Sequence, residues 1–312
     1  MKKIILDGNN RIEEPCAVTI GKFDGIHKGH LKLLKRLLEE KENGRMTVVF
    51  TFDKSIASFF SGESVQNLQL DYEKEEFLSE FGIDYLAIYP VNDKSVKISP
   101  ADFIKDILVD ALNAKVIVAG PDLSYADKGA GDFELLEEMA LQYGYTPVMI
   151  EKEVYCPDNI EISSTLVRSA VLSGDMKKVK ELLERPYSVS GKVCHGRKLG
   201  RAMSFPTVNL IMDSDKLLPP YGVYFSCVCV GTQKYYGVSN VGIKPTISDN
   251  EKPCVETHIF DFDDDLYGEY IKVELLEYMR AEMKFASIDD LKNQLASDVK
   301  SAKALVNQEK LI

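Results

Sequence analysis

The chain has 312 residues, a formal net charge of −11 and 45% hydrophobic residues, a composition that excludes disordered and fibrous proteins. A chain of this length favours two domains. The sequence contains no run of about 18 apolar residues and therefore no candidate membrane span. Charged residues also come too early in the N-terminus for a signal peptide. We therefore expect a cytoplasmic protein that binds no membrane.

Acidic residues are concentrated in the first part of the chain. Residues 1–184 contain 22 basic and 32 acidic residues, whereas residues 185–312 contain 16 and 17. Because neither part is basic, we expect no nucleic-acid partner. A nucleotide could still be bound through backbone amides, a few cations and Mg²⁺. The six cysteines form no CxxC pair, which predicts buried small hydrophobic residues rather than a metal or redox site.

Strand and helix patterns alternate in the first part of the chain. Apolar, β-branched runs predict strands, and apolar residues at helical spacing predict helices. In chain order the predicted elements are a strand at 17–21, a helix at 31–42, a strand at 46–52, a helix at 71–81, a strand at 85–90, a helix at 100–112 capped by Ser99, a strand at 115–120, a helix at 132–143 and a strand at 147–154. This alternation indicates a parallel sheet covered by helices on both faces, in an α/β domain that spans residues 1–184.

The pattern changes near Arg185-Pro186. Two short helices precede this point, at 164–172 and 175–183, and strands joined by Gly-rich turns follow it. The predicted strands lie at 188–193, 223–230, 235–241, 254–260 and 271–278, and a helix at 288–304 ends the series. Short strands of this kind predict an antiparallel β barrel or sandwich over residues 185–312, followed by a terminal helix.

The segment GKFDGIHKGH, residues 21–30, lies between the first strand and the first long helix. In a parallel sheet this position is the carboxyl end of a strand, where ligands bind. The following helix N-terminus offers free amides to a phosphate, and His27 and His30 share one helix face. We therefore predict a phosphate site, with nucleotide-binding residues Gly21, Phe23, Asp24, Gly25, His27 and His30. The alternative is a Gly-rich turn with two incidental histidines.

A second segment, EISSTLVR, begins a short helix after the last predicted strand. Ser163 or Ser164 can cap this helix, Thr165 places a hydroxyl in its first turn, and Arg168 lies one turn further on, with a planar fork suited to phosphate. Taken alone, the segment could be an ordinary capped helix. Together the two segments resemble the GxFDGxHxGH and ISSTxxR motifs of the nucleotidylyltransferase superfamily. The resemblance implies a Rossmann-like sheet in which His27, His30 and Arg168 act in catalysis.

The β domain begins with a segment rich in glycine and cations, GKVCHGRKLGR at residues 191–201. Such a segment can wrap a phosphate, and its candidate nucleotide-binding residues are Gly191, Lys192, Gly196, Gly200 and Arg201. The alternative is a flexible basic hairpin loop.

Two further groups of polar residues lie on predicted strands of this domain. Thr207 and Asn209 are two residues apart, so their oxygen atoms point to one side, and hard oxygen ligands suit Mg²⁺. Glu256 and His258 likewise share one strand face, where a carboxylate beside a metal–nucleotide site could act as a general base. The alternative in each case is a solvated strand face.

These segments together resemble the riboflavin kinase domain. The chain contains, in order, its patterns GxVxxGxxxGRxxxFPTxN, GVY, VExHIxxF, DLYG and RxExKF. With the first two motifs, the chain resembles prokaryotic bifunctional riboflavin kinase/FMN adenylyltransferases, called FAD synthetases, over about residues 17–298. The resemblance implies a Greek-key barrel of riboflavin kinase type at residues 185–312 and an adenylyltransferase domain at 1–184.

The resemblance also implies ligands and roles. ATP phosphorylates riboflavin to FMN and then adenylylates FMN to FAD, so the expected ligands are riboflavin, FMN, FAD, ATP, ADP and Mg²⁺. Thr207 and Asn209 are expected to hold Mg²⁺, and Glu256 to act as the base on the ribityl hydroxyl. The remaining residues expected at flavin are Asp122, Tyr125, Arg280, Glu282 and Phe285. We expect a monomer or a weak homo-oligomer.

Two loops of the first domain depart from the family pattern. A GxDFxFG-like loop reads GPDLSYA at residues 120–126, and Lys54 and its neighbours replace prolines after Asp53. Both loops are expected to border the flavin or adenine pocket. Three alternatives therefore remain open: a riboflavin kinase with a degenerate nucleotidylyltransferase domain, a different nucleotidylyltransferase with an appended β domain, and a non-catalytic flavin-binding regulator.

Overall fold

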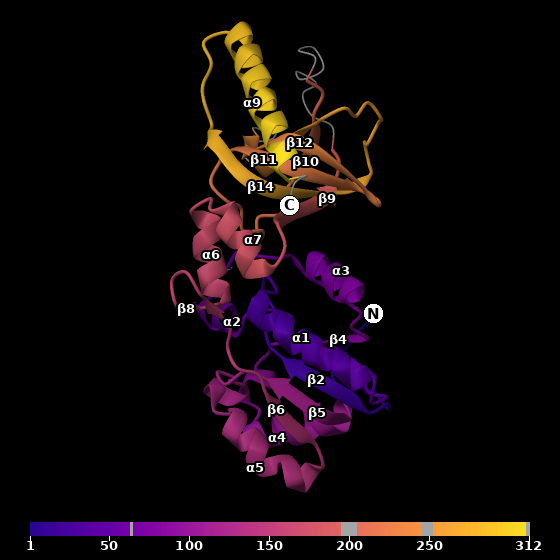
Figure 1. The fold of residues 1–312 in the computed structure, drawn as a ribbon. Helices are drawn as coiled ribbons and strands as arrows, with labels where there is room; N and C mark the ends of the chain where they lie inside the picture. The colour runs from indigo at the N-terminus through magenta and orange to yellow at the C-terminus, as the bar shows by residue number, and fades with distance from the viewer. Residues whose placement is uncertain (63–64, 195–204, 245–251, 310–312) are drawn as a thin grey trace. The chain divides into compact units, whose positions relative to one another are not determined.

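The computed structural model describes residues 1–62, 65–194, 205–244 and 252–309 (Figure 1). The chain divides into two compact units, Met1–Ser164 and Thr165–Ile312. The second unit therefore includes two helices, α6 (Ser164–Leu172, apart from its first residue) and α7 (Met176–Leu183), that precede the barrel. The domain boundary that the sequence places between residues 184 and 185 stays a prediction.

The first unit is built on a six-stranded parallel sheet. Its strands are β1 (Lys2–Ile5), β2 (Cys16–Ile20), β3 (Met46–Phe52), β4 (Tyr85–Tyr89), β5 (Ala114–Ala119) and β6 (Thr146–Met149). Its helical segments are α1 (Lys28–Lys41), α2 (Ile56–Ser61), α3 (Asp71–Phe81), η1 (Ser95–Lys97), α4 (Pro100–Asp102), η2 (Phe103–Ala111), η3 (Asp127–Gly129) and α5 (Phe133–Tyr143). A short antiparallel pair, β7 (Val154–Tyr155) and β8 (Ile160–Glu161), follows the sheet.

Alternation along the strands divides the buried side chains of this sheet between two cores. One face packs against α1 and α3, with contacts that include Ala17, Leu34 and Leu78. The other face packs against η2 and α5, with contacts that include Val18 and Phe133. Burial on both faces explains why the strands read as nearly continuous apolar runs, and the predicted α/β architecture is confirmed.

The strand order of the sheet is β1-β4-β3-β2-β5-β6. The chain steps from β2 outward through β3 and β4 on one side, and through β5 and β6 on the other. A topological switch point therefore lies between β2 and β5, and ligands of open α/β sheets bind at the carboxyl ends of such strands. The segments 21–30 and 120–126 follow these two strands directly, so the topology brings them to one end of the sheet.

The second unit contains a six-stranded antiparallel sheet with the order β10-β13-β12-β11-β14-β9. Its strands are β9 (Tyr187–Lys192), β10 (Val208–Ile211), β11 (Gly222–Val230), β12 (Gln233–Lys244), β13 (Lys252–Ile259) and β14 (Tyr270–Ala281). A bridge from the Cys194 N–H to the Asn209 carbonyl, at 2.8 Å, joins the two edges. Strand β10 pairs with β13 rather than with its sequence neighbour β11, which is a Greek-key connection, and the predicted barrel is confirmed.

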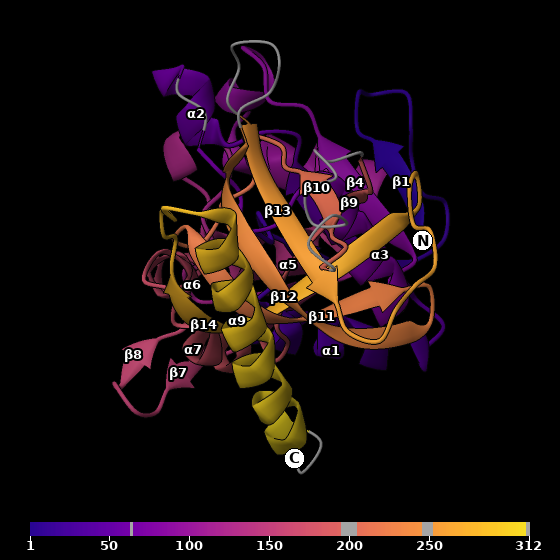
Figure 2. The ribbon, with the colours of Figure 1, turned by 90° about the horizontal axis from the view of Figure 1, so that it is seen from above.

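The terminal helix α9 (Ile288–Glu309) lies over β11 and β12 (Figures 1 and 2). Its Ala302 is fully buried against Val223 and Phe225 of β11 and Val238 of β12. The helix begins where the sequence predicts and continues five residues beyond the predicted end at residue 304.

Three local predictions differ from the structure. The strand expected at 147–154 ends at Met149, because β6 is an edge strand that pairs only with β5 and the charged residues 151–153 follow it. The helix expected at 100–112 changes after Asp102 into the wider turns of a π-helix, although Ser99 caps its start as predicted. The sequence interpretation also omits β1 and α2, which are short and carry little periodicity.

Candidate active sites

The segment between β2 and α1 has an unusual backbone. Phe23 has a φ of 50°, Gly25 of 80° and Ile26 of 41°. Residues other than glycine rarely adopt positive φ, and such conformations cluster at functional sites. A Cβ atom on Gly25 would lie 2.9 Å from Leu68 Cδ1, so glycine is required there both for its φ and for space. The first motif is therefore a strained loop held by its surroundings.

Two histidine rings are stacked at the start of α1. His27 is the N-cap residue and His30 lies in the first turn, with ring centroids 3.8 Å apart and an interplanar angle of 22°. The buried ring of Phe23 packs against His30 at 4.9 Å. A Cβ atom on Gly29 would lie 3.2 Å from His27 Cε1, so this glycine leaves room for the imidazole. The pair therefore lies at the N-terminus of α1, the positive end of the helix dipole.

Asp24 and Ser164 connect the two motifs of the first unit. The Asp24 carboxylate accepts hydrogen bonds from the backbone N–H groups of Leu68 at 2.8 Å and Gln69 at 3.3 Å. The Ser164 hydroxyl donates to the Asp24 carbonyl at 2.9 Å. Asp24 thus positions the loop through both its side chain and its backbone, in addition to any contact with a nucleotide.

The other residues predicted for this site adjoin one or the other of the two motif segments in the chain. Gly21 directly follows β2, and its N–H donates to the Phe50 carbonyl at 3.1 Å. Ser163 directly precedes α6, whereas Thr165 and Arg168 lie on α6 within the second unit. The participation of these two residues in the first site stays a prediction.

A cavity of about 260 Å³ lies where the two loops that depart from the family pattern meet. Its lining is mainly aromatic and aliphatic, from residues that include Phe52, Phe60, Tyr89, Phe103 and Tyr125. Both loops therefore contribute to one cavity, and its identity as the flavin or adenine pocket stays a prediction. Tyr125 is 1% exposed, and its hydroxyl has no hydrogen-bond partner within the described residues. Burial raises the pKa of this hydroxyl well above its usual value.

Asp122, the other residue of this loop expected at flavin, does not line the cavity. Its carboxylate is exposed and lies 3.4 Å from the Lys152 ammonium group. An exposed ion pair of this kind contributes little to stability. The structure therefore brings Tyr125, but not Asp122, to the cavity.

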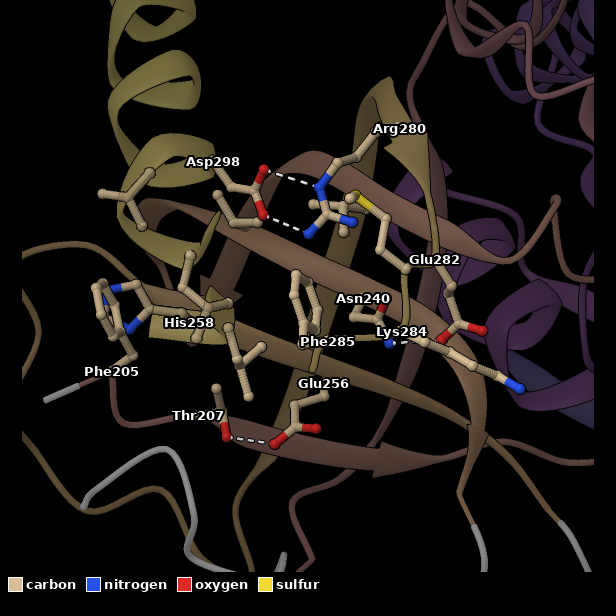
Figure 3. Close-up of a pocket in the computed structure, with 16 residues that line it drawn as sticks. Phe205, Thr207, Asn240, Glu256, His258, Arg280, Glu282, Lys284, Phe285 and Asp298 are labelled. Atoms are coloured by element: carbon tan, nitrogen blue, oxygen red, sulfur yellow. Dashed lines mark hydrogen bonds and ion pairs between the residues drawn. The ribbon is translucent and has the colours of Figure 1, made fainter. Parts of the chain in front are cut away.

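A larger cavity, of about 580 Å³, lies between the barrel and α9 (Figure 3). This volume suits a ligand of the size of a nucleoside or flavin. The wall combines apolar side chains with a few polar groups. It consists of Phe205, Thr207, Val223, Val238, Asn240, Glu256, His258, Arg280, Glu282, Met283, Lys284, Phe285, Leu291, Leu295, Asp298 and Val299.

Glu256 is the central carboxylate of this cavity. Its Oε1 accepts a hydrogen bond from the Thr207 hydroxyl at 2.6 Å, a short charge-assisted contact (Figure 3). Asn209 lies opposite Glu256 in the β10–β13 register and is 3% exposed. His258 also faces the cavity, where its Nδ1 lies 2.8 Å from the Pro206 carbonyl. The alternation of β13 thus brings Glu256 and His258 to one side, as the sequence predicts.

A buried ion pair joins the barrel to α9 beside the cavity. The Arg280 guanidinium donates from Nε and Nη2 to the two carboxylate oxygens of Asp298, at 2.9 and 2.6 Å (Figure 3). Gln294 donates to the same carboxylate at 2.9 Å, and Arg280 also donates to the Ala281 carbonyl. Arg280 therefore lines the cavity as predicted, with much of its hydrogen-bonding capacity used in holding the helix.

Comparisons with known proteins agree for both halves of the chain. The family model described as riboflavin kinase matches residues 183–306, and the one described as FAD synthetase matches residues 9–166. The bifunctional riboflavin kinase/FMN adenylyltransferase of Escherichia coli K12 is 34% identical over 294 residues, which cover 93% of each chain. The chain belongs to this bifunctional family.

A second relative supports the assignment, and a solved structure shares the fold over nearly the whole chain. The protein of the same description from Buchnera aphidicola subsp. Schizaphis graminum is 35% identical over 301 residues, covering 95% of this chain and 96% of its own. A crystal structure described as a macrolide-efflux protein from Streptococcus pneumoniae is 29% identical, covers 97% of this chain and 99% of its own, and superposes with a TM-score of 0.84. Within the described residues, no helix is long and apolar enough to cross a membrane.

Part of the predicted kinase site falls outside the described structure. Gly196, Gly200 and Arg201 lie outside the described residues. Gly191 and Lys192 end β9 and lead to a cavity of about 190 Å³, which Val193 and Thr207 help to line. Thr207 therefore lines both cavities of the barrel, and the Gly-rich segment begins beside the smaller one.

The structure also adds residues that sequence reasoning missed. Asn240 lines the larger cavity and donates to Glu282 Oε1 at 3.0 Å, and Asp298 holds Arg280. Asn240 follows a strand pattern without a motif. Asp298 lies on the barrel-facing side of α9, beside Leu295 and Val299, where the amphipathic spacing predicts an apolar residue. Their roles depend on cross-strand and helix–barrel contacts, so a linear pattern carries no signal for them.

Proposed function

We propose that the chain makes FAD in two ATP-dependent steps, with the barrel cavity as the riboflavin kinase site and the end of the parallel sheet as the FMN adenylyltransferase site. The observation that carries the kinase assignment is the Thr207–Glu256 contact at the wall of a flavin-sized cavity. Family membership supports both activities. The ligands are then riboflavin, FMN, FAD, ATP and ADP.

Glu256 accepts the proton of the ribityl hydroxyl in this proposal. The hydrogen bond that the Thr207 hydroxyl donates to Oε1 fixes the position of this carboxylate at the cavity wall, where it can meet the ribityl hydroxyl. Arg280 and Phe285 line the same cavity and would contact the flavin, with Glu282 held by Asn240 beside them. A positioned general base contributes about 10²–10⁴ in rate.

The donor set around Thr207 fits Mg²⁺. A threonine hydroxyl and an asparagine amide oxygen are hard ligands, and Asn209 lies opposite Glu256 so that the three side chains share one strand face. Bound Mg²⁺ would neutralise charge on the ATP phosphates. Thr207 lies between the two barrel cavities, so it can contact a phosphate chain that runs from the smaller cavity toward the larger one.

Adenylyl transfer needs no protein nucleophile, because the FMN phosphate attacks the α-phosphate of ATP and pyrophosphate leaves. In this proposal His27 and His30 donate hydrogen bonds to the triphosphate, and the amides at the start of α1 add partial positive charge. The aromatic cavity lined by Tyr125 holds the flavin ring. Ser164, Thr165 and Arg168 complete the phosphate contacts.

Product analysis tests the proposal directly. Purified protein incubated with riboflavin, ATP and Mg²⁺ is expected to yield FMN and then FAD, separated by chromatography. FMN without FAD, even when FMN is supplied, favours the kinase with a degenerate first domain. Flavin binding without ATP turnover favours the non-catalytic regulator.

Two variants separate the activities. Glu256→Gln is expected to lower FMN formation about 10²–10⁴-fold while FAD formation from FMN continues. Glu277→Gln is the matched control, because this β14 carboxylate pairs with Lys177 and does not line the cavity. Unchanged FMN formation in Glu256→Gln contradicts the base assignment.

The double variant His27→Ala, His30→Ala is expected to do the reverse. FMN formation should stay normal and serves as the internal control, while FAD formation falls by at least about 10²-fold, since charge-stabilising donors are lost. Normal FAD formation in this variant refutes the role of the histidine pair.

A further inference from the structure

Two cysteines and a glutamate meet on one side of the barrel, away from the cavities described above. Cys227 and Cys229 are two residues apart on β11, so their side chains point to the same side. Glu274 of β14 is the register partner of Cys227. The two sulfur atoms and a carboxylate oxygen all lie within 4.8 Å of one another. None of the three residues lines either barrel cavity.

The cluster is largely shielded from solvent and flanked by cations. Cys227 is 6% exposed, Cys229 is half-buried, and the Glu274 side chain is 13% exposed. The Lys234 ammonium lies 3.4 Å from Glu274 Oε2, which leaves Oε1 of the same carboxylate for another partner. Lys234 and Lys272 are the register partners of Cys229 on the two neighbouring strands.

We propose that Cys227, Cys229 and Glu274 form a binding site for one thiophilic divalent cation, with Zn²⁺ as the best match. Thiolate sulfur selects such ions over Mg²⁺ or Ca²⁺. Tetrahedral Zn²⁺ with Zn–S bonds of about 2.3 Å needs sulfur atoms about 3.8 Å apart, which a small movement of this cluster provides. Three protein ligands leave the fourth position to water.

The charges and protons of this binding step balance. Each thiol loses its proton to solvent as its sulfur bonds the metal, and no oxidant or reductant takes part. Two thiolates and a carboxylate exceed the charge of the cation by one, and Lys234 and Lys272 offset the excess.

A disulfide is the competing chemistry for two neighbouring cysteines, and the strand geometry disfavours it. Residues i and i+2 of an extended strand have Cα atoms about 6.6–6.8 Å apart, at the upper limit of disulfide geometry. Metal chelation has no such limit, because the ion lies between the sulfur atoms. The sequence predicts that these cysteines are buried hydrophobic residues. It does not reveal that Glu274, on another strand, is their cross-strand neighbour and a third ligand.

Cobalt is a suitable probe, because Co²⁺ takes the same tetrahedral sulfur ligands and absorbs light. The full chain is reduced, freed of metal with a chelator, and its six thiols are counted before one equivalent of Co²⁺ is added. We expect a thiolate-to-Co²⁺ charge-transfer band that saturates at one ion per chain and disappears with one equivalent of Zn²⁺. We also expect Zn²⁺ to raise the thermal midpoint.

Variants locate the ion. Cys229→Ser should weaken Co²⁺ binding more than about tenfold, since loss of a direct ligand exceeds the loss caused by second-sphere changes. Glu274→Gln should weaken binding but keep the band, and it remains informative if Cys229→Ser misfolds. Cys156→Ser is the control, because Cys156 is exposed and lies outside the cluster. Riboflavin kinase activity confirms that each variant is folded.

Three results would overturn the site. The first is the absence of a charge-transfer band at stoichiometric Co²⁺ in the fully reduced protein. The second is a band of equal strength in Cys229→Ser and the unaltered chain. The third is a count of four thiols instead of six after reduction, because Cys227 and Cys229 remain joined as a disulfide.

Discussion

The ion pair between Arg280 and Asp298 ties α9 to the barrel, and its loss should be costly. The side chain of Asp298 is 5% exposed, and that of Arg280 is 20% exposed. Removing one partner of a buried pair costs about 3–5 kcal/mol, because the other charge is left without compensation. In Asp298→Asn the amide oxygen still accepts one hydrogen bond, and Arg280 keeps its bond to the Ala281 carbonyl. We therefore expect a loss near the lower limit, about 3 kcal/mol.

Urea unfolding of the full chain, followed by a probe of the barrel, measures this change. Asp261→Asn is the matched control, because Asp261 also joins the barrel to α9, through Lys303 at 3.4 Å, but its side chain is 86% exposed. An exposed pair contributes at most about 1 kcal/mol. Because α9 forms one wall of the cavity, the KM for riboflavin should also rise in Asp298→Asn. A stability loss that equals that of Asp261→Asn refutes this reasoning.

Three further predictions concern the first unit. Gly29→Ala brings a Cβ atom to 3.2 Å from the His27 ring, so FAD formation should fall severalfold while FMN formation, assayed in parallel, stays constant. Tyr125→Phe removes a buried hydroxyl that has no hydrogen-bond partner in the described structure, so the free energy of unfolding of the ligand-free protein, measured with urea, should rise by about 1 kcal/mol. A lower free energy of unfolding instead shows that the hydroxyl has a partner. Burial raises the pKa of the Asp84 carboxyl, whereas hydrogen bonds from Thr47 and Lys41 lower it. The hydrogen bonds have the larger effect, so the folded-state pKa lies below 3.8. The stability from this carboxylate is complete above pH 3.8 and disappears as the pH falls through the folded-state pKa, and Asp84→Asn should remove that part of the acid dependence.

The elements that sequence reasoning located well are those whose signal is local. Strand β3 and helix α3 have the predicted bounds, because a β-branched run and a helical apolar period each appear within a few residues. Helix α7 likewise ends at the predicted residue 183 and begins one residue after the predicted start, with Asp175 as its cap accepting from the Lys178 N–H at 3.0 Å. The two motif sets also identified the family. The order of the strands in the barrel, by contrast, depends on which strands pair, and the sequence of a single strand does not specify its partner.

The parts that escaped prediction depend on contacts between distant segments. The hydrogen bonds of the Asp24 carboxylate to Leu68 and Gln69 reach more than forty residues along the chain, whereas its contact with a nucleotide stays a prediction. Asp122 keeps its place in the motif, but its position at the loop surface directs it to Lys152. Such partners are set by how the strands are ordered in the sheet, which no single segment encodes.

Under the proposed function neither reaction forms a covalent bond to the protein, so the rate depends on positioning and charge. The two sites achieve positioning by different means. At the first, a strained loop and Gly29 hold the rings of His27 and His30 in contact before any ligand binds. At the second, hydrogen bonds between polar side chains, such as Thr207 with Glu256, fix the groups. The catalytic groups of the first site therefore depend on the backbone conformation around them, whereas those of the second depend on hydrogen bonds between side chains.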